Sequence, residues 1–274
     1  MLPALLTACS GVDLLNATVP TDTYRRTDGL AYGGDPRQRL DVYQPAESVN
    51  NAPLVVFFYG GSWSSGERGD YRFVGEALAS RGMVAVVADY RLSPAFRYPA
   101  FVQDSASAVR WAFDHGAQYG ADKDRIFVMG HSAGAYNAAM IALDPRWLAA
   151  VGLAPSRLAG WIGLAGPYDF LPIGDAQTRV AFNWPETSAD SQPLRYASNA
   201  SPPALLLAPV HDSVVNPQRS TVALAQRLQA SGVRVESALF DGVSHVTLLA
   251  SMAPVLRRQA PVLERVTGFV QSTG

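Results

Sequence analysis

A serine between two glycines is the first candidate for chemistry in this sequence, in the run Gly130-His131-Ser132-Ala133-Gly134. A serine hydroxyl attacks a carbonyl only when a base removes its proton. Such a pentapeptide also arises by chance as a plain glycine-rich turn, so its context and partners must decide. Ser132 stands between a run of apolar residues and an alanine-rich stretch. A turn between a strand and a helix exposes the hydroxyl and places a helix N-terminus behind it. We therefore predict that Ser132 is a nucleophile.

The base that activates this serine must be one of four histidines. They are His115, His131, His211 and His245. In a strand–turn–helix arrangement the acid and then the histidine follow the serine along the chain. The first two histidines precede Ser132, and His211 adjoins the best acid candidate, Asp212. His245 is left, in a loop after an apolar strand. We predict that it is the base rather than a surface residue.

The acid that orients this histidine should follow an earlier strand. Asp212 follows the apolar run 203–210, and its separation from His245 leaves room for one helix and one strand. Both loops would then reach the same edge of a parallel sheet. Asp169 and Asp241 are the alternatives. We favour Asp212, whose role would be to fix the imidazole tautomer and stabilise the imidazolium.

An oxyanion in such a reaction needs hydrogen-bond donors that are already in place. Gly60 and Gly61 follow the apolar run 53–58, where a loop can expose backbone N–H groups. Ala133, the residue after the serine, is the third candidate donor. The alternative for the glycine pair is a plain turn without chemistry.

The elements that must position these residues alternate between strands and helices. Two strands are expected within 23–45, and six apolar strands within 53–61, 82–91, 125–130, 160–170, 203–210 and 234–240. Helices are expected at about 71–81, 99–116, 131–143, 216–232 and 253–271. Continuous apolar strands alternating with helices are typical of a parallel sheet covered on both faces. The fold class predicted is therefore α/β, with segment 172–202 as a lid-like insertion.

Length and composition limit the possible classes. The chain has 274 residues, of which 48% are hydrophobic and 16% charged, with a net charge of −1. This composition is that of a globular protein with a substantial core. Without a basic stripe, nucleic acid is not an expected partner. No apolar run is long enough for a transmembrane helix. We predict an N-terminal tail over residues 1–20 and a single catalytic domain over 21–274.

Cys9 is the only cysteine, so no internal disulfide can form. The surrounding Leu6-Thr7-Ala8-Cys9-Ser10 resembles the lipobox of a bacterial lipoprotein. Only eight residues precede Cys9 and none is basic, which departs from an ordinary signal peptide. The tail is expected to be either a frayed end or the remnant of a lipoprotein signal. Lipidation would anchor the protein to a bacterial membrane, periplasmic or outer; without it a cytoplasmic location is expected.

With these motifs in place, the chain resembles the carboxylesterases of the α/β-hydrolase superfamily. The likeness is to the hormone-sensitive-lipase-like and feruloyl-esterase-like branches. Its motifs here are Tyr59-Gly60-Gly61-Ser62-Trp63, Tyr90-Arg91-Leu92-Ser93-Pro94 and the serine pentapeptide. The segments around Asp212 and His245 match the family's acid and histidine segments. The resemblance implies an α/β-hydrolase fold and covers about Tyr24 to the C-terminus.

Two departures from the family pattern stand out. Tyr59 replaces the histidine that braces the oxyanion loop, and its hydroxyl is expected to take over that role. Ala208-Pro209 replaces the common His-Gly of the acid segment. Asp89, Arg91 and Asp104 are expected to brace neighbouring loops.

The function predicted is a serine carboxylesterase that hydrolyses esters of short to medium chain length. Trp63, Phe182 and Trp184 are expected to line its substrate pocket. Neither a metal nor a cofactor is required for this chemistry, and a small-molecule ester is the expected partner. An amidase of the arylformamidase kind and a non-catalytic binding protein of the same fold are the alternatives.

Overall fold

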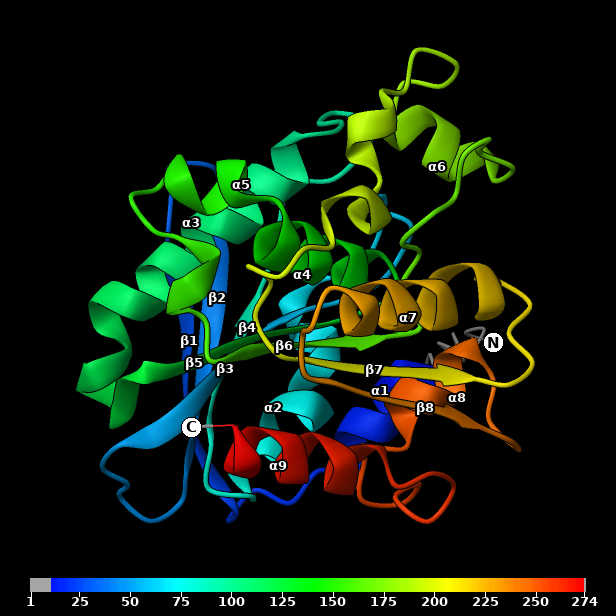
Figure 1. The fold of residues 1–274 in the computed structure, drawn as a ribbon. Coiled ribbons are helices and arrows are strands. Elements are labelled where there is room, and N and C mark those ends of the chain that lie inside the picture. Colours follow the sequence, from blue (N-terminus) through cyan, green and yellow to red (C-terminus); the bar gives the residue numbers. More distant parts are fainter. Residues whose placement is uncertain (1–10, 274) are drawn as a thin grey trace, which may run out of the picture.

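A twisted eight-stranded sheet runs through the molecule (Figure 1); the computed structural model describes residues 11–273. Its strands are β1 (Tyr24–Ala31), β2 (Arg39–Pro45), β3 (Ala52–Phe58), β4 (Val84–Ala88), β5 (Ala121–His131), β6 (Gly160–Leu164), β7 (Ala204–Pro209) and β8 (Val235–Phe240). They lie in the order β1-β2-β4-β3-β5-β6-β7-β8. The strands from β3 to β8 are parallel to one another, and β1 and β2 pair antiparallel at one edge.

The central strands owe their position to their apolar sequences. Every residue of β3, β4, β6 and β7 is buried. A strand that faces helices on both sides has no solvent-exposed face, so it shows no alternation of apolar and polar residues. The α/β fold class predicted from these runs is confirmed.

Helices cover both faces of the sheet. They are α1 (Gly11–Ala17), α2 (Arg72–Ala79), α3 (Ala100–His115), α4 (Ala133–Leu143), α5 (Pro145–Ala149), α6 (Ala176–Ala181), α7 (Ala223–Ala230), α8 (His245–Ala250) and α9 (Val262–Ser272). Figure 1 shows α3, α4 and α7 on one face, and α2 and α9 on the other. All eleven residues of α4 are buried. None of the helices within residues 11–273 is long and apolar enough to span a membrane.

Two stretches near the ends of the chain differ from the sequence-based expectation. Part of the predicted N-terminal tail forms α1, whose Asn16 is 8% exposed. The last helix begins at Val262 rather than near residue 253. Pro261 explains this boundary, because proline lacks an N–H group and is tolerated only at the start of a helix. Cys9, the predicted lipidation site, lies outside the described residues, and its modification stays a prediction.

The expected insertion between residues 172 and 202 breaks the alternation of strands and helices, as its composition indicated. It contains the short helix α6 and two 3-10 turns, Ala189–Ser191 and Pro193–Tyr196. Asp175 begins α6 by accepting a hydrogen bond from the N–H of Thr178 at 2.7 Å. The segment therefore has local structure of its own beside the carboxyl end of β6.

Candidate active site

Ser132 is the single residue between β5 and α4. Its backbone angles, φ 54° and ψ −121°, lie in a region that non-glycine residues seldom adopt. Its N–H donates to the carbonyl of Leu164 on β6 at 2.9 Å. A Cβ on Gly134 would lie 2.0 Å from the carbonyl oxygen of Phe58, and one on Gly130 would lie 2.1 Å from that of Gly134. The turn therefore requires glycine on both sides of the serine.

The three residues predicted to act together form one hydrogen-bonded chain. His245 Nε2 lies 2.8 Å from Ser132 Oγ. On the other side of the ring, Nδ1 lies 2.7 Å from Asp212 Oδ2. The side chains of His245 and Asp212 are 8% and 1% exposed. Because β5, β7 and β8 are parallel members of one sheet, the residues that follow them meet at one edge.

The structure also shows which of the three candidate aspartates contacts His245. Asp169 forms an ion pair with Arg219, with Oδ2 and Nε 2.9 Å apart. Asp241 lies on the surface. Only Asp212 contacts His245 among the three aspartates that the sequence left open.

The charge of Asp212 determines the tautomer of His245. Burial by itself would raise the pKa of the Asp212 carboxyl. The hydrogen bond to His245, and those that Oδ1 accepts from the N–H groups of Val215 and Val214 at 3.0 and 2.8 Å, outweigh burial and lower that pKa. A carboxylate holds a proton on His245 Nδ1. Nε2 is then the acceptor for the proton of the Ser132 hydroxyl.

A second histidine, which sequence reasoning excluded as the base, lies against the first. The rings of His131 and His245 have centroids 4.9 Å apart. His131 Nε2 donates to the backbone carbonyl of His245 at 2.9 Å. Burial, and then the proximity of His245, lower the pKa of His131 to about 3. His131 is therefore neutral at physiological pH and holds the backbone of His245.

The loop after β3 brings the predicted oxyanion residues to the serine. A Cβ on Gly60 would lie 2.9 Å from Ser132 Cβ. Gly61 and Ser62 have φ values of 119° and 49°, so the chain turns sharply here. Both line a cavity that also contains Ser132. The sequence did not indicate that Ser62, which directly follows the glycine pair, would line both cavities. The donor roles of Gly60, Gly61 and Ala133 stay predictions.

Tyr59 braces this loop, as expected of the residue that replaces the family histidine. Its hydroxyl donates to Asp89 Oδ1 at 2.8 Å and accepts from Arg37 Nη2 at 2.8 Å. The Tyr90 hydroxyl donates to the carbonyl of Tyr59 at 2.8 Å. Arg68 holds Asp89 from the other side through its backbone N–H and its guanidinium. The loop thus rests on a buried polar network rather than on a histidine.

The other pair expected to brace a loop also forms. Asp104 is 1% exposed and accepts from Arg91 Nη2 at 2.7 Å and from the Arg91 backbone N–H at 2.8 Å. This pair fixes the loop after β4 against α3.

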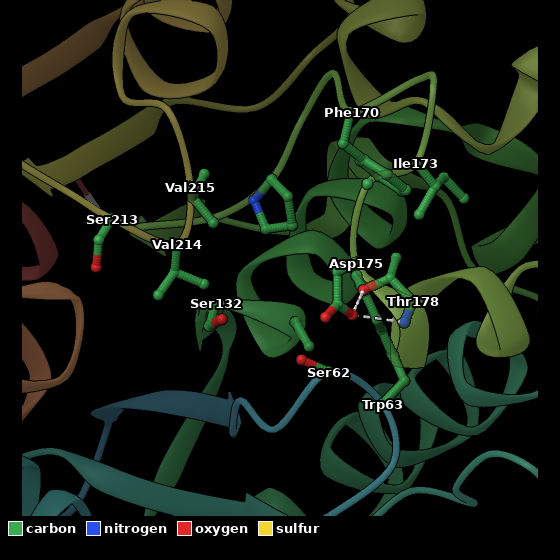
Figure 2. Close-up of a pocket in the computed structure, with 13 residues that line it drawn as sticks. Ser62, Trp63, Ser132, Phe170, Ile173, Asp175, Thr178, Ser213, Val214 and Val215 are labelled. Atoms are coloured by element: carbon green, nitrogen blue, oxygen red, sulfur yellow. Dashed lines mark hydrogen bonds between the residues drawn. The ribbon is translucent and has the colours of Figure 1, made fainter.

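Two cavities open on Ser132. The first, of about 420 Å³, is shown in Figure 2. Its lining includes Trp63, Phe170, Ile173, Asp175, Thr178 and Val215. The second, of about 260 Å³, lies on the side of His245 and the glycine loop. Among residues 11–273, no group of three or more His, Cys, Asp or Glu side chains is arranged to hold a metal ion.

The predicted pocket residues are only partly correct. Trp63 lines the first cavity. Phe182 and Trp184 line neither of the two cavities beside Ser132. Phe182 is 2% exposed because it packs edge-on against Trp63, with ring centroids 4.8 Å apart. Trp184 is half-buried against the core. The lid-like segment instead contributes Ile173, Asp175 and Thr178.

Known proteins resemble this chain in sequence and in fold. It is 27% identical over 240 residues to an isoprenylcysteine alpha-carbonyl methylesterase of Arabidopsis thaliana, covering 80% of this chain and 56% of the relative. It is 36% identical over 152 residues to the carboxylesterase NlhH of Mycobacterium tuberculosis, covering 51% of this chain and 47% of that relative. The chain thus spans about half the length of the curated relatives it matches. The structure of apo esterase 2 of Thermogutta terrifontis superposes with a TM-score of 0.76 at 25% identity, covering 93% of this chain and 97% of that one.

A family model settles the relationship. The model named BD-FAE matches residues 40–228, which include the glycine loop, the serine turn and Asp212. The sheet order and the serine turn described above are those of an α/β-hydrolase. The chain belongs to the BD-FAE family and has the α/β-hydrolase fold.

Proposed function

We propose that this protein is a serine carboxylesterase. The observation that carries the proposal is the hydrogen-bonded chain from Asp212 through His245 to Ser132, with both bonds shorter than 3 Å. A histidine held in the Nδ1–H tautomer by a buried carboxylate, beside a serine in a strained turn, is the arrangement of acyl-transfer enzymes. Relatives named carboxylesterase and methylesterase support the same reaction.

The reaction follows from the geometry in two halves. Ser132 Oγ attacks the ester carbonyl carbon while His245 Nε2 takes the hydroxyl proton. Backbone N–H groups of the glycine loop and of Ala133 stabilise the oxyanion. The bond to the leaving oxygen then breaks, and Nε2 returns the proton to the departing alcohol. Water, deprotonated by the same nitrogen, attacks the acyl carbon. The bond to Ser132 Oγ then breaks, Nε2 returns the proton to Oγ, and the acid is released.

The size and lining of the first cavity support a preference for acyl groups of short to medium length. Its volume of about 420 Å³ lies at the lower end of the range of small-molecule pockets. Trp63, Phe170 and Ile173 give it apolar walls. An amide substrate would use the same residues, so amidase activity is the second candidate. Rates on matched esters and amides of one acid would separate the two activities.

Hydrolysis of p-nitrophenyl esters from acetate to palmitate tests the proposal. The wild-type protein should show its highest kcat/KM on short chains. Ser132→Ala should lose several orders of magnitude in kcat. Ser107→Ala, at a half-buried serine on α3 that lines neither of the two cavities, is the matched control and should keep wild-type rates. Equal rates for the wild type and Ser132→Ala would exclude the mechanism. A protein inactive on esters and amides alike would support a binding role.

A further inference from the structure

The N-terminal helix α1 lies beside the catalytic residues, although its sequence indicated a tail. Val12 and Leu15 line the second cavity together with Gly60, Ser62 and His245. The two apolar side chains are three residues apart and so lie on one face of the helix. Leu14, on another face, is 66% exposed. Figure 1 shows α1 next to α8, which begins with His245.

The side chain of Asn16 holds this helix against the segment before α2. Asn16 Nδ2 donates to the carbonyls of Gly69 and Asp70 at 3.1 and 3.0 Å. Its Oδ1 accepts from the N–H of Phe73 at 3.2 Å. Phe73 and Tyr71 line the same cavity as Val12. The amide therefore uses its donors and its acceptor to hold α1 against residues 69–73, a segment that also lines this cavity.

The two cavities must take different parts of an ester. The leaving oxygen has to lie near His245 Nε2, because that nitrogen protonates it. His245 lines the second cavity and is absent from the lining of the first. The first cavity contains Ala133 and Trp63 instead. The alcohol therefore enters the second cavity and the acyl group the first.

We propose that α1 is a wall of the alcohol subsite, and that Val12 and Leu15 set which alcohols the enzyme accepts. The inference rests on the proposed esterase function and adds a specificity determinant to it. The apolar lining selects alkyl or aryl alcohols over charged ones. The volume of about 260 Å³ limits their size.

Val12→Trp tests the inference. The matched control is Leu14→Trp, on the same helix at an exposed position outside the cavity lining. The substrates are ethyl, butyl and hexyl acetate, followed by proton release at constant pH. A second series keeps the alcohol constant and varies the acid. Its substrates are ethyl acetate, ethyl butyrate and ethyl hexanoate. Val12→Phe, a smaller intrusion with Leu14→Phe as its control, replaces the tryptophan pair if thermal unfolding shows that Val12→Trp does not fold.

The expected result is confined to the alcohol series. Because an added group that a pocket cannot hold costs about tenfold or more, Val12→Trp should lower kcat/KM for hexyl acetate relative to ethyl acetate by at least ~10-fold. Leu14→Trp should leave this ratio unchanged. All acetates give the same acetyl-enzyme, so the rate of deacylation should stay at the wild-type value in both variants.

Three results would overturn the inference while the esterase function stands. The first is an unchanged hexyl-to-ethyl ratio in Val12→Trp. The second is an equal loss on every acetate, and the third is a shift in the acyl series instead. Failure of the esterase function looks different, because wild type and Ser132→Ala would then show the same rates on all esters, and the inference would fall with it.

Discussion

Replacing Asp212 by asparagine should abolish base catalysis through a reversal of the histidine tautomer. Oδ1 of Asp212 accepts the N–H groups of Val214 and Val215, whereas Oδ2 faces His245 Nδ1. An asparagine must keep its oxygen toward the two backbone donors, because its NH₂ group cannot accept from them. The NH₂ then donates to Nδ1. The imidazole proton moves to Nε2, which faces Ser132 and can no longer accept its proton.

The size of the effect follows from the loss of that acceptor. A triad with its acid converted to the amide loses about 10⁴-fold in kcat. At about 1.4 kcal/mol for each factor of ten, this corresponds to roughly 5 kcal/mol of lost transition-state stabilisation. Stability should change little, because the two hydrogen bonds to Val214 and Val215 persist in Asp212→Asn.

The assay is p-nitrophenyl acetate hydrolysis at pH 7, with thermal unfolding to confirm that each variant folds. Asp169→Asn is the matched control. Asp169 also follows a strand but pairs with Arg219 on a partly exposed surface, where an ion pair contributes little. We expect that control to keep at least half of the wild-type kcat. An Asp212→Asn variant with more than a tenth of wild-type activity would refute the tautomer argument, and a larger loss in Asp169→Asn would reassign the acid.

Three further predictions concern the supports of the site. Tyr59→Phe removes a buried hydroxyl that donates to Asp89, and should lower the free energy of unfolding in urea by about 1–3 kcal/mol; a loss under ~0.5 kcal/mol would contradict the bracing role. The pKa of His131 is lowered to about 3 by burial, against about 6.5 in an unfolded chain, so the unfolded state binds more protons between these values. The contribution of His131 to the free energy of unfolding is then complete above pH ~6.5. It falls toward pH ~3 by up to about 1.4 kcal/mol per pH unit. His131→Gln should flatten this slope in urea titrations at several pH values, and an unchanged slope would argue against a neutral buried imidazole. Gly134→Ala places a Cβ 2.0 Å from a backbone oxygen and should prevent folding or lower the melting temperature by many degrees. Gly268→Ala, a helical position with open space, should stabilise by up to about 1 kcal/mol, and equal melting temperatures for the two variants would refute the packing argument.

The hydrogen-bonded chain of Ser132, His245 and Asp212 was predictable because each of these residues depends on information close to it in the sequence. Ser132 is marked by its glycines and by the change from a strand to a helix pattern. Asp212 and His245 each follow an apolar run that folds as a parallel strand. The strand order then brings their loops to one edge of the sheet, and only four histidines had to be distinguished.

The walls of the site were not predictable in the same way. α1 has seven residues, and the hydrogen-bond partners of its Asn16 lie more than fifty residues away. Sequence patterns carry no signal for such a contact, so a seven-residue stretch of mixed polarity near the start of the chain is interpreted as a tail. Phe182 and Trp184 failed as pocket residues for a related reason. Aromatic composition does not reveal whether a ring faces the cavity or, like Phe182, packs behind Trp63.

This division between predictable and unpredictable residues has a physical basis. Ser132, Asp212 and His245 all follow strands of one sheet, so the backbone hydrogen bonds of the sheet hold the segments that carry them at one edge. The cavity walls come from segments outside the sheet, α1 on one side and residues 173–178 on the other. Side-chain hydrogen bonds, such as those of Asn16 and Asp175, help to hold these segments, so we expect substitutions in them to leave the strands in place. Changes at Val12 or Ile173 should therefore alter which esters bind while leaving the geometry between Ser132 and His245 intact.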